Sequence, residues 1–143
     1  MIDREAIAAA LFDVARDSGG YVTVGRRLRH WSDVTPTEMP ALFMSEKGGH
    51  AAYQAQAVPT TWTLRYDFFI YAHSSHPYRA PAIVLNELLD SLERALLPSP
   101  TTGLQRLGLD TVRHARIEGE VQTDEGVLGD LAIAIVPVEI LAV

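Results

Sequence analysis

Five histidines are the side chains of this sequence best suited to chemistry, because imidazole binds metals and transfers protons near neutral pH. His73 and His76 stand three residues apart after an expected strand, and His50 lies in an expected turn. The pair is not part of a His-Glu-x-x-His motif, and no carboxylate stands at a useful spacing from it. We therefore interpret residues 73–77 as a solvated loop, and we predict no metal and no cofactor.

The hydroxyl and carboxyl side chains form no catalytic motif that we recognise. Ser32, Ser74 and Ser75 are not in a G-x-S-x-G turn, and a Ser, His and Asp set can be picked from almost any chain of this length. Glu118 and Glu120 alternate along an expected strand, which is typical of the solvent-facing side of an antiparallel sheet. We predict that the protein is not an enzyme.

Positive charge is concentrated just before Trp31 in an otherwise acidic chain. The sequence has 12 Lys and Arg against 18 Asp and Glu, and its net charge of −6 disfavours nucleic-acid binding through the overall field. One interpretation of the cluster is a surface strand with weak ion pairs. We favour a patch that faces DNA in a channel or acidic residues of a neighbouring subunit, because ring contacts join two different surfaces. The candidate contact residues are Arg26, Arg27, Arg29, Trp31, Lys47 and His50.

The elements that must position these residues begin with a helix over residues 3–17. Asp3 is suited to the N-cap, and a Gly-Gly pair follows the helix. Residues 21–31 mix β-branched and charged side chains and predict a strand. Residues 32–40 predict a loop, because Pro36 and Pro40 disfavour regular pairing.

A hairpin is predicted next, and we expect it to project from the core. Residues 41–45 predict a short strand, residues 46–50 a turn built on Gly48-Gly49, and residues 51–57 the returning arm. The hairpin has almost no large apolar side chain, so it would contribute little to a core.

The clearest strand pattern covers residues 60–72, where Phe68 and Ile70 fall on one face and Phe69 on the other. A helix over residues 79–97 carries a wide leucine stripe that suits a sheet face. Two strands complete the pattern, residues 112–122 and 128–141 around a turn at 123–126, and the last is apolar enough to be covered on both sides.

The order of elements predicts one α+β domain over residues 1–143, with two helices flanking a mainly antiparallel sheet and a projecting β-hairpin. The chain has no cysteine, which excludes disulfides and Cys-ligated metal sites. The sequence after Met1 has no signal-peptide pattern, and its apolar runs are too short to span a membrane.

Several segments resemble the small phage tail terminator proteins of the minor tail protein U type. The resemblance covers most of the chain, and its motifs are structural rather than catalytic. It is carried by the N-terminal helix, by Arg27-x-x-x-Trp31, by the Pro40-Ala41-Leu42-Phe43 strand, by the strand from Trp62 to Tyr71, by the Leu-rich second helix and by the C-terminal strand ending Val138-Glu139-Ile140.

The resemblance implies a subunit of a ring, expected to be a hexamer, that closes the head-proximal end of a phage tail tube. The implied partners are other copies of the chain, the tail tube protein and a head-completion or connector protein, with DNA passing through the pore and no membrane. The expected location is the tail of the virion, after assembly in the host cytoplasm. The alternatives are a head-tail connector or neck protein and, less favoured, a small His-containing enzyme or ligand-binding domain.

Overall fold

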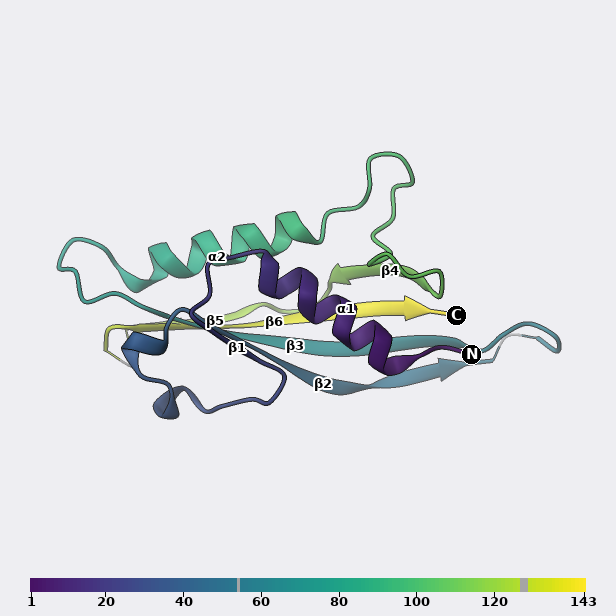
Figure 1. Cartoon of the computed structure of the whole chain (residues 1–143), viewed down its shortest axis with the longest axis horizontal. Helices are drawn as coiled ribbons and strands as arrows, with labels where there is room; N and C mark the ends of the chain where they lie inside the picture. Colours follow the sequence, from purple (N-terminus) through teal and green to yellow (C-terminus); the bar gives the residue numbers. More distant parts are fainter. Residues whose placement is uncertain (54, 127–128) are drawn as a thin grey trace.

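The computed structural model describes residues 1–53, 55–126 and 129–143, and it confirms the α+β class. A six-stranded sheet has the order β1-β2-β3-β6-β4, with β5 also paired to β6 (Figure 1). No helix in these ranges is long and apolar enough to cross a membrane. The elements are α1 (Arg4–Asp17), β1 (Thr23–Gly25), η1 (Trp31–Asp33), η2 (Pro36–Glu38), β2 (Ala41–Ala52), β3 (Thr61–His73), α2 (Pro81–Ala95), β4 (Val112–Ile117), β5 (Gln122–Glu125) and β6 (Leu131–Ala142).

Both helices cover one face of the sheet, which we call the helix face (Figure 1). Helix α1 begins as predicted, because the Asp3 side chain accepts a hydrogen bond from the backbone N–H of Ala6 at 3.0 Å. On β3, Phe68 and Ile70 are fully buried in one cluster with the α2 residue Leu92. The predicted register of β3 and the covering role of the leucine stripe are therefore confirmed.

The opposite face of the sheet is covered in part by residues 26–40. We call this segment the strap, and we call the face that it covers the strap face. The prediction of a strand over residues 21–31 was wrong beyond β1, which ends at Gly25. Strand β1 runs parallel to β2, so the chain must travel back along the sheet before β2 can begin. The strap makes this return, and it contains the two short 3₁₀ turns η1 and η2.

The predicted turn at residues 46–50 is also wrong, because β2 continues through it. Glu46 pairs with Tyr66 and Gly49 pairs with Leu64, so the strand holds one extra residue as a β-bulge. Gly48 has a φ of 87°, and a Cβ on Gly49 would lie 3.0 Å from the Leu64 side chain. The glycines therefore permit a bulge and a close approach rather than a reversal.

The reversal between β2 and β3 lies further along the chain, where Val58 donates a backbone hydrogen bond to Ala55 at 3.1 Å. The returning arm predicted over residues 51–57 was wrong, since residues up to Ala52 belong to β2; residue 54 of that range lies outside the described residues. The β2–β3 hairpin extends past the body of the sheet beside both chain termini, as expected of a projecting hairpin (Figure 1). We call its distal part, residues 50–62, the arm.

The C-terminal strands differ from the prediction at Pro137. Strand β5 pairs with the part of β6 before this proline, and β4 pairs with the part after it. The single strand predicted over residues 112–122 is therefore split into two. Pro137 has no N–H, but its carbonyl accepts a bond from Glu118 at 3.1 Å, and Gly119 stands against its ring. The turn predicted at 123–126 overlaps β5 and is therefore wrong. The predicted first residue of the last strand, Leu128, lies outside the described residues.

Candidate assembly surface

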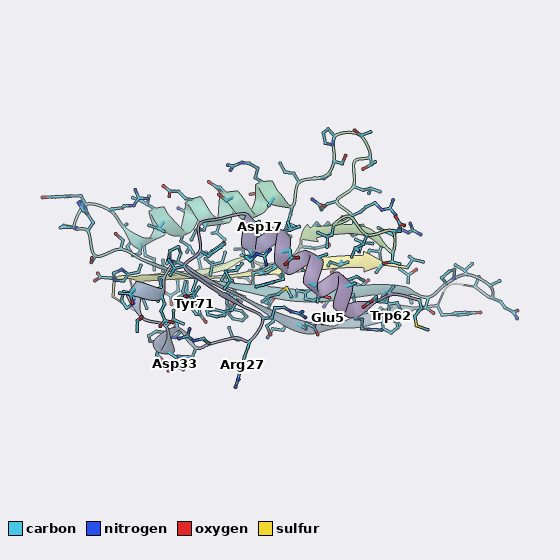
Figure 2. All side chains as sticks on the ribbon, in the orientation of Figure 1. Glu5, Asp17, Arg27, Asp33, Trp62 and Tyr71 are labelled. Carbon is cyan, nitrogen blue, oxygen red and sulfur yellow. The ribbon has the colours of Figure 1, made fainter. Side chains whose placement is uncertain are left out.

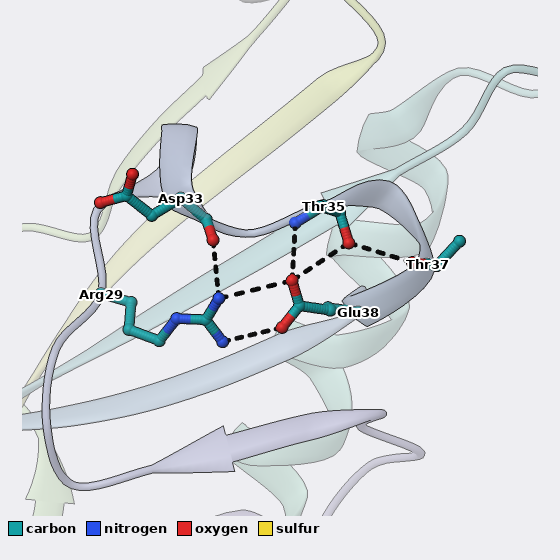
Figure 3. Close-up of polar contacts among 5 residues, drawn as sticks. All are labelled: Arg29, Asp33, Thr35, Thr37 and Glu38. Carbon is teal, nitrogen blue, oxygen red and sulfur yellow. Dashed lines mark hydrogen bonds and ion pairs between the residues drawn. The ribbon is translucent and has the colours of Figure 1, made fainter.

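The strap is held in place by a polar cluster around Arg29 (Figure 3). The Arg29 guanidinium donates to both carboxylate oxygens of Glu38, at 2.8 and 3.4 Å, and to the backbone carbonyl of Asp33 at 2.6 Å. Glu38 also accepts hydrogen bonds from the N–H of Thr35 at 3.1 Å and from its hydroxyl at 3.0 Å. The Arg29 guanidinium therefore joins the two 3₁₀ turns of the strap, η1 through the Asp33 carbonyl and η2 through the Glu38 carboxylate.

These donors determine the charge state of Glu38. The bond from Arg29, followed by the bonds from Thr35, lowers the pKa of Glu38 from its ordinary 4.5 to about 2. The carboxylate stays ionised at all physiological pH values. Because both side chains are more than one-third exposed, water screens the ion pair, and its main consequence is the geometry of the strap.

An apolar cluster lies between the strap and the sheet. Val34 and Met39 of the strap are buried against Phe43 and Tyr71 of the sheet. The Tyr71 hydroxyl donates to the backbone carbonyl of Arg29 at 2.6 Å, so a sheet residue holds the base of the polar cluster. Burial raises the pKa of Tyr71, which keeps this hydroxyl a donor at neutral pH.

Trp31, predicted as a contact residue, packs partly into this cluster rather than standing free. Its ring also lies beside that of His30, with the centroids 5.0 Å apart. The His30 side chain accepts a hydrogen bond from the N–H of Ser32 at 3.2 Å and so caps the first 3₁₀ turn. Trp31 is therefore only partly accessible to a partner.

The three predicted arginines have different surroundings. Arg26 forms ion pairs with Glu5 of α1 and Glu46 of β2, which join the helix face to the edge of the sheet. Arg29 is engaged within the strap. Arg27 is exposed and directed away from the body of the molecule (Figure 2), and no described residue forms an ion pair with it. Its charge is therefore available to another molecule.

Lys47 and His50 lie on the part of β2 that extends beyond β1, and both are exposed. The ammonium group of Lys47 stands 5.8 Å from the centroid of the Phe69 ring, on the strap face of the sheet. His50 pairs with Thr63 near the base of the arm. These two candidates therefore belong to the arm end of the sheet, and the arginines belong to the strap end.

The histidines are not brought together. His50 stands opposite Thr63 of β3, and His73 ends the same strand ten residues later, a separation of roughly 33 Å at the usual rise of a strand. His76 accepts a hydrogen bond from the N–H of Tyr78 at 3.1 Å and so shapes its own loop. Among the described residues, no group of His, Cys, Asp or Glu is placed to hold a metal ion.

Sequence reasoning missed the exposed apolar side chains at the sheet edge and on the arm. Val22 directly precedes β1 and Val24 lies within it. Tyr53 and Val58 lie on the arm, where the side chain of Tyr53 is 70% exposed. The sequence did contain a signal for this exposure, because Tyr53 and Val58 stand near Pro59 in a segment with few other large apolar residues. No family model matches this chain, and no curated protein matches it.

Proposed function

We propose that this chain is a structural virion protein, a tail terminator that forms a ring at the head-proximal end of a phage tail tube. The ring would stop polymerisation of the tube and present a surface to the head-completion complex. The chain would act by binding rather than by catalysis. The proposal combines the resemblance described above with the surfaces that the subunit leaves available.

The arm is the observation that carries this proposal. It extends beyond the layers that form the core (Figure 1), and it holds Tyr53 and Val58 in solvent. Over residues 46–52 the outer edge of β2 extends beyond β1, and within residues 1–53, 55–126 and 129–143 no other strand pairs with it. An extended limb with exposed apolar side chains and an open strand edge suits docking to another protein chain.

The strap supplies the second contact region. Its polar cluster and buried underside give it a defined shape, so Arg27 is presented from a supported loop rather than from a free tail. A single free arginine is suited to steering and aligning an acidic partner surface. Within the proposed ring, that surface belongs to a neighbouring copy, and DNA would pass through the pore without base-specific contacts.

The decisive experiment is a knockout of the gene in its phage, complemented by the wild-type chain. Without the protein, heads should fill while tails become overlong and stay unjoined in electron micrographs. Complementation with a Tyr53→Ser/Val58→Ser variant should restore joining poorly, whereas a Tyr78→Ser variant, altered in an exposed loop far from the arm, should restore it fully. Tails of normal length joined to heads in the knockout would contradict the proposal.

A head-tail connector or neck protein is the second candidate, because a projecting arm and an open strand edge are equally suited to contacts between the head and the tail. The same knockout distinguishes the two. A missing terminator leaves tails without length control, whereas a missing connector leaves finished tails of normal length beside filled heads. Light scattering on the purified protein measures whether it forms a closed ring before it meets the tube.

A further inference from the structure

Strands β1 and β5 are outer strands on opposite sides of the sheet, and their residues lie at the same level across it. Thr23 of β1 stands level with Ala41 of β2 and, through it, with Tyr71 of β3. The row continues through Ile133 of β6 to Asp124 of β5. In the described part of the chain, β1 pairs only with β2 and β5 pairs only with β6. Each therefore has one free side.

The strand directions allow these two edges to pair with each other. Strand β1 is parallel to β2, and β2 is antiparallel to β3. Strand β3 is antiparallel to β6, which in turn is antiparallel to β5. It follows that β1 and β5 run in opposite directions. If a second copy stands beside the first in the same orientation, its β5 meets β1 as an antiparallel neighbour, the geometry of an ordinary ladder.

The charges at the two edges are opposite on the strap face. The row that contains Tyr71 faces the strap, so Asp124 also points to that face at the free edge of β5. Arg27 follows two residues after Gly25, where β1 ends and the strap begins. The carboxylate of Glu120, in phase with Asp124, is also exposed, whereas the exposed Glu125 points to the helix face. No described residue forms an ion pair with these acids or with Arg27.

On the helix face the β1 edge presents two valines, and the β5 edge presents one valine beside Thr123 and Glu125. Val24 belongs to the row that contains Leu42 and Ile70, so it points to the helix face, and it is 37% exposed. Val22 lies two residues before it and is 63% exposed. At the other edge, Val121 directly precedes β5 and is 40% exposed. A joint between the edges would remove these side chains from water.

We propose that the β1 edge of one copy, Val22 to Arg27, adds to the β5 edge of the next copy, Glu120 to Glu125, so that the sheet continues from subunit to subunit. The contact is head-to-tail, because one surface meets a different surface, and a head-to-tail contact produces a ring when its rotation closes. This inference rests on the proposed function and names the interface through which that ring is built.

The first test is a charge exchange between two variants, followed by light scattering at low salt. Continued along both edges, the register that places Val24 opposite Thr123 places Arg27 opposite Glu120. Arg27→Glu alone and Glu120→Arg alone should each weaken association about tenfold or more, because like charges then meet at every joint. A 1:1 mixture should recover the ring, since every joint between unlike copies pairs opposite charges. Arg94→Glu, on the exposed side of α2, is the matched control and should associate like the wild type. Circular dichroism confirms that each variant is folded.

The second test is cross-linking in a chain that has no cysteine of its own. Val24 and Thr123 stand at the same level on opposite edges, so the joint would bring their Cα atoms within the reach of a disulfide. A Val24→Cys/Thr123→Cys chain should form a ladder of oligomers under mild oxidation. Neither single variant should give more than a dimer.

The outcomes separate this inference from the proposed function. A wild-type ring that survives both charge reversals and gives no cross-linked ladder overturns the interface and leaves the terminator proposal standing. A ladder from the double variant, combined with normal tails in the phage knockout, supports the interface and overturns the terminator. A chain that neither associates nor cross-links at high concentration contradicts the interface.

Discussion

The two faces of the sheet are covered in different ways. The helix face is closed by apolar area, with α1 and α2 lying over a continuous cluster that includes Phe68 and Ile70. The strap face is closed over one end only, by a loop whose small apolar cluster lies beneath the polar contacts of Arg29 and Glu38. The rest of that face, around Arg65 and Asp67, lies outside this cluster.

This difference indicates a division of labour. Burial of apolar area is non-directional, so the helix face supplies most of the stability. Hydrogen bonds and ion pairs at a partly exposed site contribute less free energy but impose a specific geometry. The strap face therefore shapes a surface, and the candidate contacts of the molecule lie there and along the sheet edges. The predictions below test this division, from the largest expected effect to the smallest.

Phe68→Ala should produce the largest loss, about 3–5 kcal/mol in the free energy of unfolding, because it leaves a cavity in the fully buried helix-face core. Denaturant titration followed by circular dichroism measures it. Phe69→Ala is the matched control on the next residue of β3, where the ring is only half-buried on the strap face, and it should cost clearly less. Equal losses at the two positions would contradict the division between the faces.

Deletion of residues 47–51 should prevent cooperative folding, because this segment is part of β2 and pairs with β3 rather than forming a loop. Deletion of residues 55–57, at the reversal of the arm, should leave the fold intact. Thermal unfolding monitored by circular dichroism compares the two. A cooperative transition near the wild-type temperature after the first deletion would show that the outer half of β2 is dispensable.

Tyr71→Phe should cost about 0.5–1.5 kcal/mol, the usual net value of a hydrogen bond, because it removes the donor to the Arg29 carbonyl but keeps the buried ring. The larger change should be local, with faster amide hydrogen exchange across the strap and little change in β3 or α2. Uniformly faster exchange would mean that the strap and the core open together.

The strap should open in acid before the helix face unfolds. The pKa of Glu38 is lowered to about 2 in the folded protein, below its ordinary 4.5, so its contribution is present above pH 4.5 and is lost as the pH falls through about 2. Trp31 fluorescence in a Trp62→Phe background reports the opening. A Glu38→Gln variant should lack the acid transition, because its side chain does not titrate. The same transition in that variant would assign it to another carboxyl group.

Local sequence determined the elements whose patterns are self-contained. Asp3 followed by helical spacing specified α1, and strict alternation specified β3 with its two faces. The leucine stripe after Pro81 specified α2 and its role as a cover. In each case the period and the cap belong to the element itself, so no distant residue was needed to interpret them.

Tertiary structure decided the features that depend on a partner strand. Gly48-Gly49 is a plausible turn from its residues alone, but pairing with the long strand β3 makes it a bulge. Residues 26–31 leave the sheet because β1 and β2 are parallel, and only this return brings Arg29 to Glu38 and leaves Arg27 free. The sequence identified the arginines as a cluster. Pairing between distant segments determined that two are engaged within the subunit and one is available to a neighbour.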